Sequence, residues 1–95
     1  MVIWWSTPAT QQLSAVHEYI AANDKATATE TANYIWDSVD ILARHPFAGR
    51  KGRVGGTREL VIAGTPFVVA YRIEKNEVHV LAVLHASREW PEGFE

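Results

Sequence analysis

A basic, glycine-rich stretch between residues 44 and 58 is the clearest candidate for chemistry in this sequence. It contains four glycines, no acidic residue and five cationic residues, which are Arg44, Arg50, Lys51, Arg53 and Arg58. A glycine-rich loop can bring backbone N–H groups and cations to a single anion. The stretch therefore indicates either an anion-binding loop or a solvated connector whose charges keep it in water.

One histidine is placed to take part in proton transfer. His85 follows a long apolar run and lies close to the basic Arg88. An unperturbed imidazole pKa near ~6.5 suits acid–base chemistry, although a hydrogen-bonded histidine at the end of a strand is the structural alternative. His17, His45 and His79 lack the spacing of metal ligands, so we expect neither a metal site nor another cofactor.

Length, composition and charge restrict the class of protein. With 95 residues, 47% of them hydrophobic and 21% charged, the chain is expected to form one globular domain over residues 1–95. The absence of cysteine excludes disulfide scaffolds, cysteine-ligated zinc and thiol catalysis. A net charge of −2 gives no overall basic balance for nucleic-acid binding. We expect a cytoplasmic protein, because no apolar run reaches the ~18–20 residues that span a membrane.

The first half of the chain is predicted to form a strand and two helices. Residues 2–5 are β-branched and aromatic, as in a short strand. Thr7 is expected to cap a helix that has Pro8 in its first position. Asn23-Asp24 is expected to end this helix and to cap a second one, which Pro46 ends. Two helices joined this closely form a hairpin.

The tryptophans of this half divide between the core and the surface in our prediction. Trp36 lies on the apolar stripe of the second helix and is expected in the core. Trp4 and Trp5 are neighbours in a strand, so they should point to opposite faces, with one covered by a partner or a neighbouring element.

The second half changes from helical to strand periodicity near residue 57. Residues 57–62, 67–73 and 78–85 are predicted strands, and Lys75-Asn76 is a tight turn between the last two. Short turns imply antiparallel neighbours. The predicted fold class is therefore α+β, with an N-terminal strand and a two-helix hairpin packed on one face of an antiparallel sheet. Because the last two strands are apolar on both faces, Trp90 and the C-terminal tail, or a partner, should cover the other face.

The order and spacing of several segments resemble the RelE/ParE superfamily of type II toxin–antitoxin toxins. The matching segments are Thr-Arg-Glu-Leu at residues 57–60, Val-Ala-Tyr-Arg-Ile at 69–73, and the run from Val83 through His85 and Trp90 to Pro91. The likeness extends from about Trp5 to Pro91, and its terminal pattern is most similar to the ParE-like branch.

This resemblance implies a bacterial growth inhibitor that a partner antitoxin neutralises, in which an antitoxin helix or strand covers apolar surface of the toxin. RelE-like members cut mRNA in the ribosome, whereas ParE-like members poison DNA gyrase and have no nuclease site. A net charge of −2 with three lysines suits RNA binding poorly and favours the ParE-like function. The alternatives are a RelE-like endoribonuclease and an inactive relative that only binds its antitoxin.

The resemblance also suggests site residues, whose roles depend on the branch. In a RelE-like enzyme the catalytic candidates are Arg58, Arg72, His85 and Arg88. The candidates for binding a target are Arg50, Lys51, Arg53 and Trp90. We expect the four catalytic candidates to share one surface, with Lys51 and Arg53 at its rim. The structural alternatives are an ion pair of Arg58 with Glu59 or Glu74, and packing roles for Tyr71 and Trp90.

Overall fold

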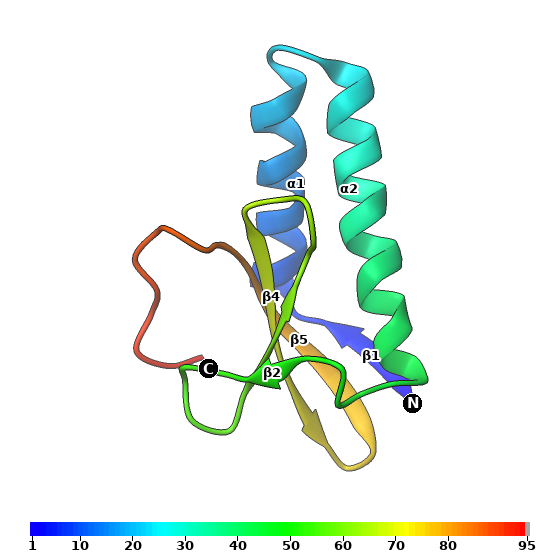
Figure 1. Cartoon of the computed structure of the whole chain (residues 1–95), viewed down its shortest axis with the longest axis vertical. Coiled ribbons are helices and arrows are strands. Elements are labelled where there is room, and N and C mark those ends of the chain that lie inside the picture. Colours follow the sequence, from blue (N-terminus) through cyan, green and yellow to red (C-terminus); the bar gives the residue numbers. More distant parts are fainter. Residues whose placement is uncertain (95) are drawn as a thin grey trace.

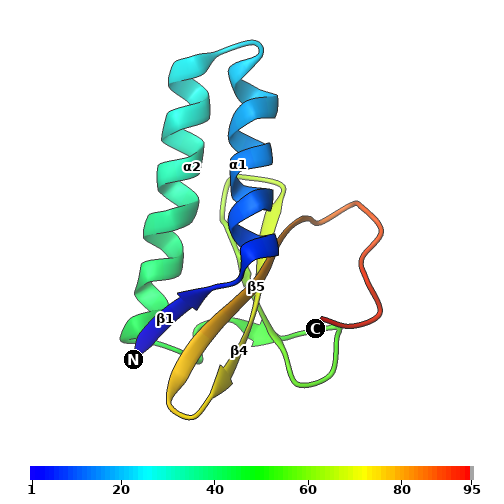
Figure 2. The same ribbon diagram turned by 180° about the vertical axis from the view of Figure 1, so that it is seen from behind.

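The computed structural model describes residues 1–94 and contains two helices and a five-stranded sheet (Figure 1). The elements in chain order are β1 (Val2–Trp5), α1 (Thr7–Ala21), α2 (Lys25–Asp40), the 3-10 turn η1 (Ile41–Ala43), β2 (Arg50–Lys51), β3 (Arg58–Val61), β4 (Phe67–Glu74) and β5 (Glu77–His85). The helices form an antiparallel hairpin on one side of the sheet and project beyond it, as the reverse view in Figure 2 also shows.

Local hydrogen bonds explain where the helices begin. Ser6 caps α1, because its Oγ accepts a hydrogen bond from the N–H of Ala9 at 3.1 Å. The expected cap, Thr7, is instead the first helical residue, one position later than Ser6. Asn23-Asp24 was predicted to cap α2, and Asp24 is the residue that does so, with its Oδ1 accepting from the N–H of Thr27 at 3.0 Å. This hydrogen bond and a second one from the Thr27 hydroxyl to Oδ2 hold the pKa of Asp24 below its ordinary value.

The sheet has the strand order β1-β5-β4-β3-β2. The predicted α+β class is confirmed, and β3, β4 and β5 pair antiparallel as expected. The two-residue strand β2, which was not predicted, pairs antiparallel with β3. The N-terminal strand differs, because β1 lies parallel to β5 and makes the sheet mixed. The helical hairpin between β1 and the rest of the sheet supplies the long crossover that parallel pairing needs. The predicted turn joins β4 to β5, with positive φ angles of 50° at Lys75 and 61° at Asn76.

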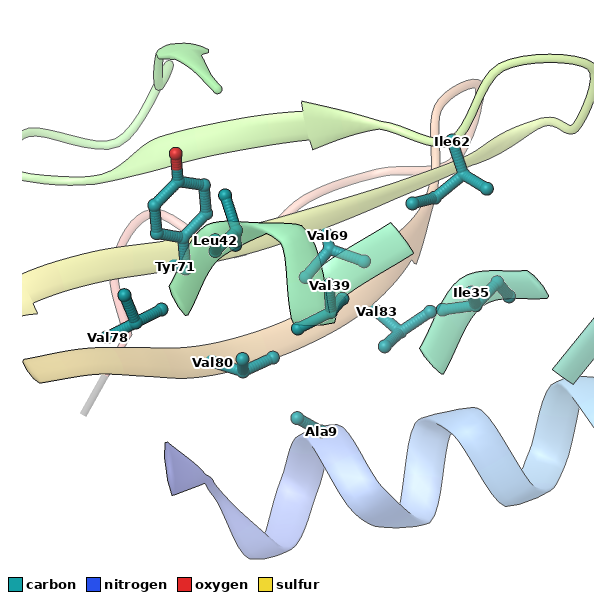
Figure 3. Close-up of a cluster of buried hydrophobic side chains, with 10 residues drawn as sticks. All are labelled: Ala9, Ile35, Val39, Leu42, Ile62, Val69, Tyr71, Val78, Val80 and Val83. Atoms are coloured by element: carbon teal, nitrogen blue, oxygen red, sulfur yellow. The ribbon is translucent and has the colours of Figure 1, made fainter. Parts of the chain in front are cut away.

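The core lies between the helical hairpin and one face of the sheet, here called the helix-side face. It contains ten buried residues, shown in Figure 3, which are Ala9, Ile35, Val39, Leu42, Ile62, Val69, Tyr71, Val78, Val80 and Val83. The predicted core position of Trp36 is wrong, since 48% of this residue is exposed. It follows Ile35 by about 100° around the helix, which turns it to the rim, where it stacks on Trp5 at 4.9 Å.

The opposite face of the sheet, here called the tail-side face, is also buried over its central strands. Val68, Ala70 and Ala82 are each no more than 2% exposed. The C-terminal tail, residues 86–94, contacts this face, because the Nη2 of Arg72 donates to the carbonyl of Phe94 at 3.3 Å. The prediction that the tail covers the second face therefore agrees with the structure. Neither helix of residues 1–94 has the length and apolar character that crossing a bilayer requires.

Candidate functional site

Strand alternation divides the basic stretch between the two faces of the sheet. Arg50 pairs with Glu59 and Lys51 pairs with Arg58 across the β2–β3 ladder. Paired residues project to the same face and successive residues to opposite faces. Arg58 in turn pairs with the core residue Tyr71, so Lys51 and Arg58 belong to the helix-side face. Arg50 and Glu59 belong to the tail-side face.

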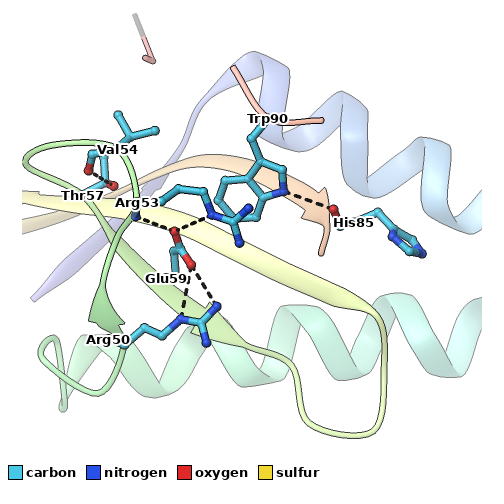
Figure 4. Close-up of polar contacts among 7 residues, drawn as sticks. All are labelled: Arg50, Arg53, Val54, Thr57, Glu59, His85 and Trp90. Carbon is cyan, nitrogen blue, oxygen red and sulfur yellow. Dashed lines mark hydrogen bonds and ion pairs between the residues drawn. The ribbon is translucent and has the colours of Figure 1, made fainter. Parts of the chain in front are cut away.

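Glu59 organises the tail-side half of the stretch, as Figure 4 shows. Its side chain is only 3% exposed and forms ion pairs with Arg50 at 3.0 Å and with Arg53 at 3.4 Å. It also accepts a hydrogen bond from the backbone N–H of Arg53 at 2.8 Å. Burial raises the pKa of Glu59, but these hydrogen bonds and charges outweigh it and bring the pKa below the ordinary value of 4.5. A buried carboxylate thus neutralises part of the basic stretch.

The tail joins this cluster through a cation–π contact. The guanidinium carbon of Arg53 lies 3.5 Å from the centre of the Trp90 ring. The Nε1 of Trp90 donates to the carbonyl of His85 at 3.2 Å, which ties the ring to the end of β5 (Figure 4). Arg50, Arg53 and Trp90 therefore form one continuous surface around Glu59, here called the tail-side cluster.

Hydrogen bonds near both ends of the basic stretch, residues 44–58, hold it in place. The Tyr71 hydroxyl, fully buried, accepts from the N–H of Gly49 at 2.9 Å and donates to the carbonyl of Pro46 at 2.7 Å. Burial raises the pKa of Tyr71, although the Gly49 hydrogen bond and the charge of Arg58 oppose it. Further along, the N–H of Gly52 donates to the carbonyl of Thr57 at 2.8 Å. Tyr71 has the structural role that the sequence suggested.

On the helix-side face, Lys51 and Arg58 line an open pocket of about 390 Å³. The guanidinium carbon of Arg58 lies 4.8 Å from the centre of the Phe47 ring, and its Nη1 donates to the carbonyl of Gly49 at 2.7 Å. No carboxylate within residues 1–94 forms an ion pair with Lys51 or Arg58. The expected ion pair of Arg58 with Glu59 or Glu74 is thus wrong. Glu59 is the next residue of the same strand and faces the opposite side, and Glu74 pairs with Arg72 instead.

His85 has the geometry of a hydrogen-bonded strand-end histidine. Its Nδ1 lies 3.2 Å from the backbone nitrogen and 2.8 Å from the Oγ of Ser87. Because the backbone N–H of Ser87 can only donate, this hydrogen bond assigns the neutral ring a proton on Nε2. The ring also meets Phe67 edge-on at 5.8 Å. Arg88 is exposed, and its backbone N–H donates to the carbonyl of His85 at 3.1 Å.

Arg72 lies at the other end of the β4–β5 hairpin. It pairs with His79, whereas His85 pairs with Phe67. Five residues along a strand at about 3.3 Å each place Arg72 roughly 17 Å from Phe67. Arg72 faces the tail side, where its Nη1 pairs with Glu74 at 3.3 Å.

The expectation that the four catalytic candidates share one surface is therefore wrong. Arg58 and Arg72 lie on opposite faces of the sheet, and β4 separates Arg58 from His85. The long β4–β5 hairpin keeps its two ends apart. The structure instead brings together Arg50, Arg53 and Trp90, and separately Lys51 and Arg58.

Sequence reasoning missed two residues that organise these groups. Glu59 was considered only as a partner of its neighbour Arg58, although strand alternation excludes that pair. Phe47 follows Pro46 outside the predicted helix and gave no periodic signal, yet it is 66% exposed beside Arg58. No group of three metal-ligating side chains occurs within residues 1–94.

Comparisons with known proteins give the chain clear relatives. A family model described as the ParE toxin of the type II toxin–antitoxin system parDE matches residues 3–90. Y4kP of Sinorhizobium fredii, which carries the name of a toxin, is 39% identical over 90 residues, spanning 95% of this chain and 93% of that protein. Toxin RelE2 of Caulobacter vibrioides is 31% identical over 84 residues, spanning 88% and 93% of the two chains.

A solved structure has the same fold. It belongs to the chromosomal ParDE TA system from P. aeruginosa and aligns with a TM-score of 0.82 over 92% of this chain and 97% of that one. The sequence identity is 24%, so this likeness bears on the architecture alone.

Proposed function

The chain belongs to the ParE toxin family of type II toxin–antitoxin systems, and on that premise we propose that it inhibits growth by binding DNA gyrase. In this proposal it acts as a protein-binding inhibitor and carries out no nuclease chemistry. The observation that supports it most is the neutralisation of Arg50 and Arg53 by the buried Glu59.

Cleavage of RNA needs cations around one phosphate and a nearby group that moves a proton. In this chain the basic candidates are divided between two faces, and the loop arginines of the tail-side face already have a carboxylate partner. His85 is separated from Arg72 by the length of the β4–β5 hairpin. This arrangement favours a protein-binding surface over a phosphate-cleaving site.

The tail-side cluster is our candidate for the surface that contacts the target. Arg50 and Arg53 keep 58% and 46% of their side chains exposed while Glu59 holds them in place. Trp90 adds an aromatic ring to the same surface. Aromatic residues and arginine are the types enriched where protein interfaces concentrate their binding energy.

A type II toxin has an antitoxin partner, and the exposed apolar residues of this chain suggest where that partner binds. Most of the large ones lie on or beside the helical hairpin and β1, namely Met1, Val2, Trp4, Tyr19, Tyr34, Trp36 and Ile41. We propose that a segment of the antitoxin covers part of this surface, as amphipathic helices do in apolar grooves. The sequence suggested that a partner could cover the second face of the sheet. Because the tail-side face is already buried, the exposed residues of the helical hairpin and β1 now support antitoxin binding instead.

Two assays on the purified toxin, run side by side, test this proposal. One measures supercoiling by DNA gyrase and the other measures mRNA cleavage on translating ribosomes. Inhibited supercoiling with intact mRNA is the expected result. Cleaved mRNA with unaffected supercoiling contradicts the proposal and supports the RelE-like alternative. No effect in either assay, together with tight antitoxin binding, supports the inactive relative.

A further inference from the structure

We propose that the pocket formed by Phe47, Lys51, Arg58 and Ile73 receives an acidic side chain of the antitoxin, together with an adjacent apolar side chain. This inference rests on the proposed function, in that it requires an antitoxin that binds the toxin. It goes beyond that function by assigning one pocket and the chemistry of the segment that enters it.

The first argument is the position of the two cations. Lys51 and Arg58 are directly opposite each other in the β2–β3 ladder. Like charges directly opposite in a sheet are destabilising. Within residues 1–94 nothing relieves this repulsion, because no carboxylate there pairs with either side chain. Glu59, one residue after Arg58, neutralises the cations of the other face only. The pocket is thus built to receive a negative charge from outside.

The second argument is the apolar part of the pocket. Phe47 is 66% exposed, and Ile73, which also lines the pocket, is partly buried and packs against the core. The Arg58 guanidinium covers one region of the Phe47 ring and leaves the rest open. An apolar side chain next to the acid would bury this surface, while the acid forms charge-assisted hydrogen bonds with Lys51 and Arg58.

The charge of the site favours a peptide over a nucleic acid. Nucleic-acid affinity comes chiefly from neutralising several phosphates in succession. On this face the pocket offers two cations, and the chain as a whole has a net charge of −2. Two cations beside an exposed aromatic ring suit one carboxylate and one apolar side chain of a peptide.

Charge reversal at Lys51 tests this proposal, because it should separate binding from stability. In Lys51→Glu the new carboxylate lies opposite Arg58 and replaces repulsion by a cross-strand ion pair. The free toxin should therefore unfold at the same or a higher temperature. Its affinity for the full-length cognate antitoxin should fall by about 10- to 100-fold, because the carboxylate of the antitoxin now meets a like charge. The salt dependence of binding should also weaken.

A matched control comes from the turn between β4 and β5. Lys75→Glu makes the same change in net charge at an exposed position that lies outside both the pocket lining and the helical hairpin. Its affinity for the antitoxin should stay within about twofold of wild type, since only the total charge differs. Phe47→Ala is the second pocket variant. It keeps both cations, and its affinity should fall by about 10-fold if the apolar half of the pocket also binds.

Each outcome decides between the claims. Wild-type toxin that fails to bind the antitoxin contradicts the proposed function and removes the basis of this inference with it. Wild-type binding that both Lys51→Glu and Phe47→Ala leave unchanged overturns the inference alone. Equal losses in Lys51→Glu and Lys75→Glu also overturn it, because they indicate a general charge effect. A 20-nucleotide RNA that binds through Lys51, with antitoxin affinity unchanged, would assign the pocket to nucleic acid instead.

Discussion

On the tail-side face of the sheet, Arg50 and Arg53 meet the buried carboxylate of Glu59, whereas on the helix-side face Lys51 and Arg58 have no carboxylate partner in residues 1–94. Both pairs come from the same basic stretch. The difference arises because adjacent residues of β2 and of β3 point to opposite faces. A charge summed along a sequence therefore says little about the field at either face until the strand register is known.

Substitution of Gly49, which contacts both Tyr71 and the backbone of Glu59, should cause the largest loss of stability. In Gly49→Ala the added Cβ would lie 2.5 Å from the Tyr71 hydroxyl and 2.9 Å from the carbonyl of Glu59. Because the second neighbour is backbone, we expect a loss of about 3 kcal/mol in the free energy of unfolding. Urea denaturation measures it. Gly55→Ala, whose Cβ would meet nothing within 4 Å, is the control, and equal losses in the two variants would contradict this account.

Removing the Tyr71 hydroxyl, which contacts Gly49, should lower the stability by a smaller amount. Tyr71→Phe leaves the N–H of Gly49 and the carbonyl of Pro46 without their buried partner. An unsatisfied buried polar group costs about 1–3 kcal/mol, so we expect a loss near 2 kcal/mol in urea denaturation. Tyr34→Phe, which removes a hydrogen bond to Ala63 from a residue 44% exposed, is the matched control and should lose less. A stability of Tyr71→Phe equal to wild type would argue against a structural role of the hydroxyl.

Neutralising Glu59 should affect the tail-side cluster alone, with a signature in pH. The folded-state pKa of Glu59 lies below its ordinary value of 4.5. Its contribution to stability is therefore complete above pH 4.5 and is lost as the pH falls through the folded-state pKa. We expect Glu59→Gln to be less stable than wild type by about 1 kcal/mol at pH 7, with the difference shrinking towards pH 3.

Urea titrations at pH 7, 4 and 3 measure this difference. Glu30→Gln, at an exposed position of α2 that forms no ion pair in the described residues, is the control. A gap between Glu59→Gln and wild type that stays constant from pH 7 to pH 3 would show that the carboxylate charge is not what stabilises the loop.

Local sequence signals, namely periodicity, helix caps and turn residues, predicted most of the fold. The helical stripe, the Asp24 cap and the Lys75-Asn76 turn are local signals, and each appears in the structure. The parallel position of β1 was not predictable from local signals, because it depends on where the helical hairpin returns the chain. Trp36 was misplaced because an apolar stripe predicts a face of a helix, whereas the width of that face depends on packing.

The candidate site was harder to predict, because it depends on register. The cationic residues are evident in the sequence, but their grouping depends on the cross-strand pairs Arg50–Glu59 and Lys51–Arg58. β2 has only two residues and lies in a glycine-rich stretch, so no alternating pattern of apolar and polar residues predicted it. The contact of Arg53 with Trp90 joins residues far apart in the sequence and had no sequence signal.

The central claim is that this toxin arrests growth without a nuclease site, and a double variant tests it most directly. Arg58→Ala and His85→Ala together remove one of the two helix-side cations and the proton-transfer candidate, while the tail-side cluster stays intact. Induced expression in a bacterial host, without antitoxin, should arrest growth as strongly as wild type does, because neither residue carries out chemistry in this account. Loss of a general acid–base group from a nuclease would instead slow cleavage by roughly 10²–10⁴-fold. Normal growth with a double variant that melts like wild type, under conditions where wild type is toxic, would contradict the claim.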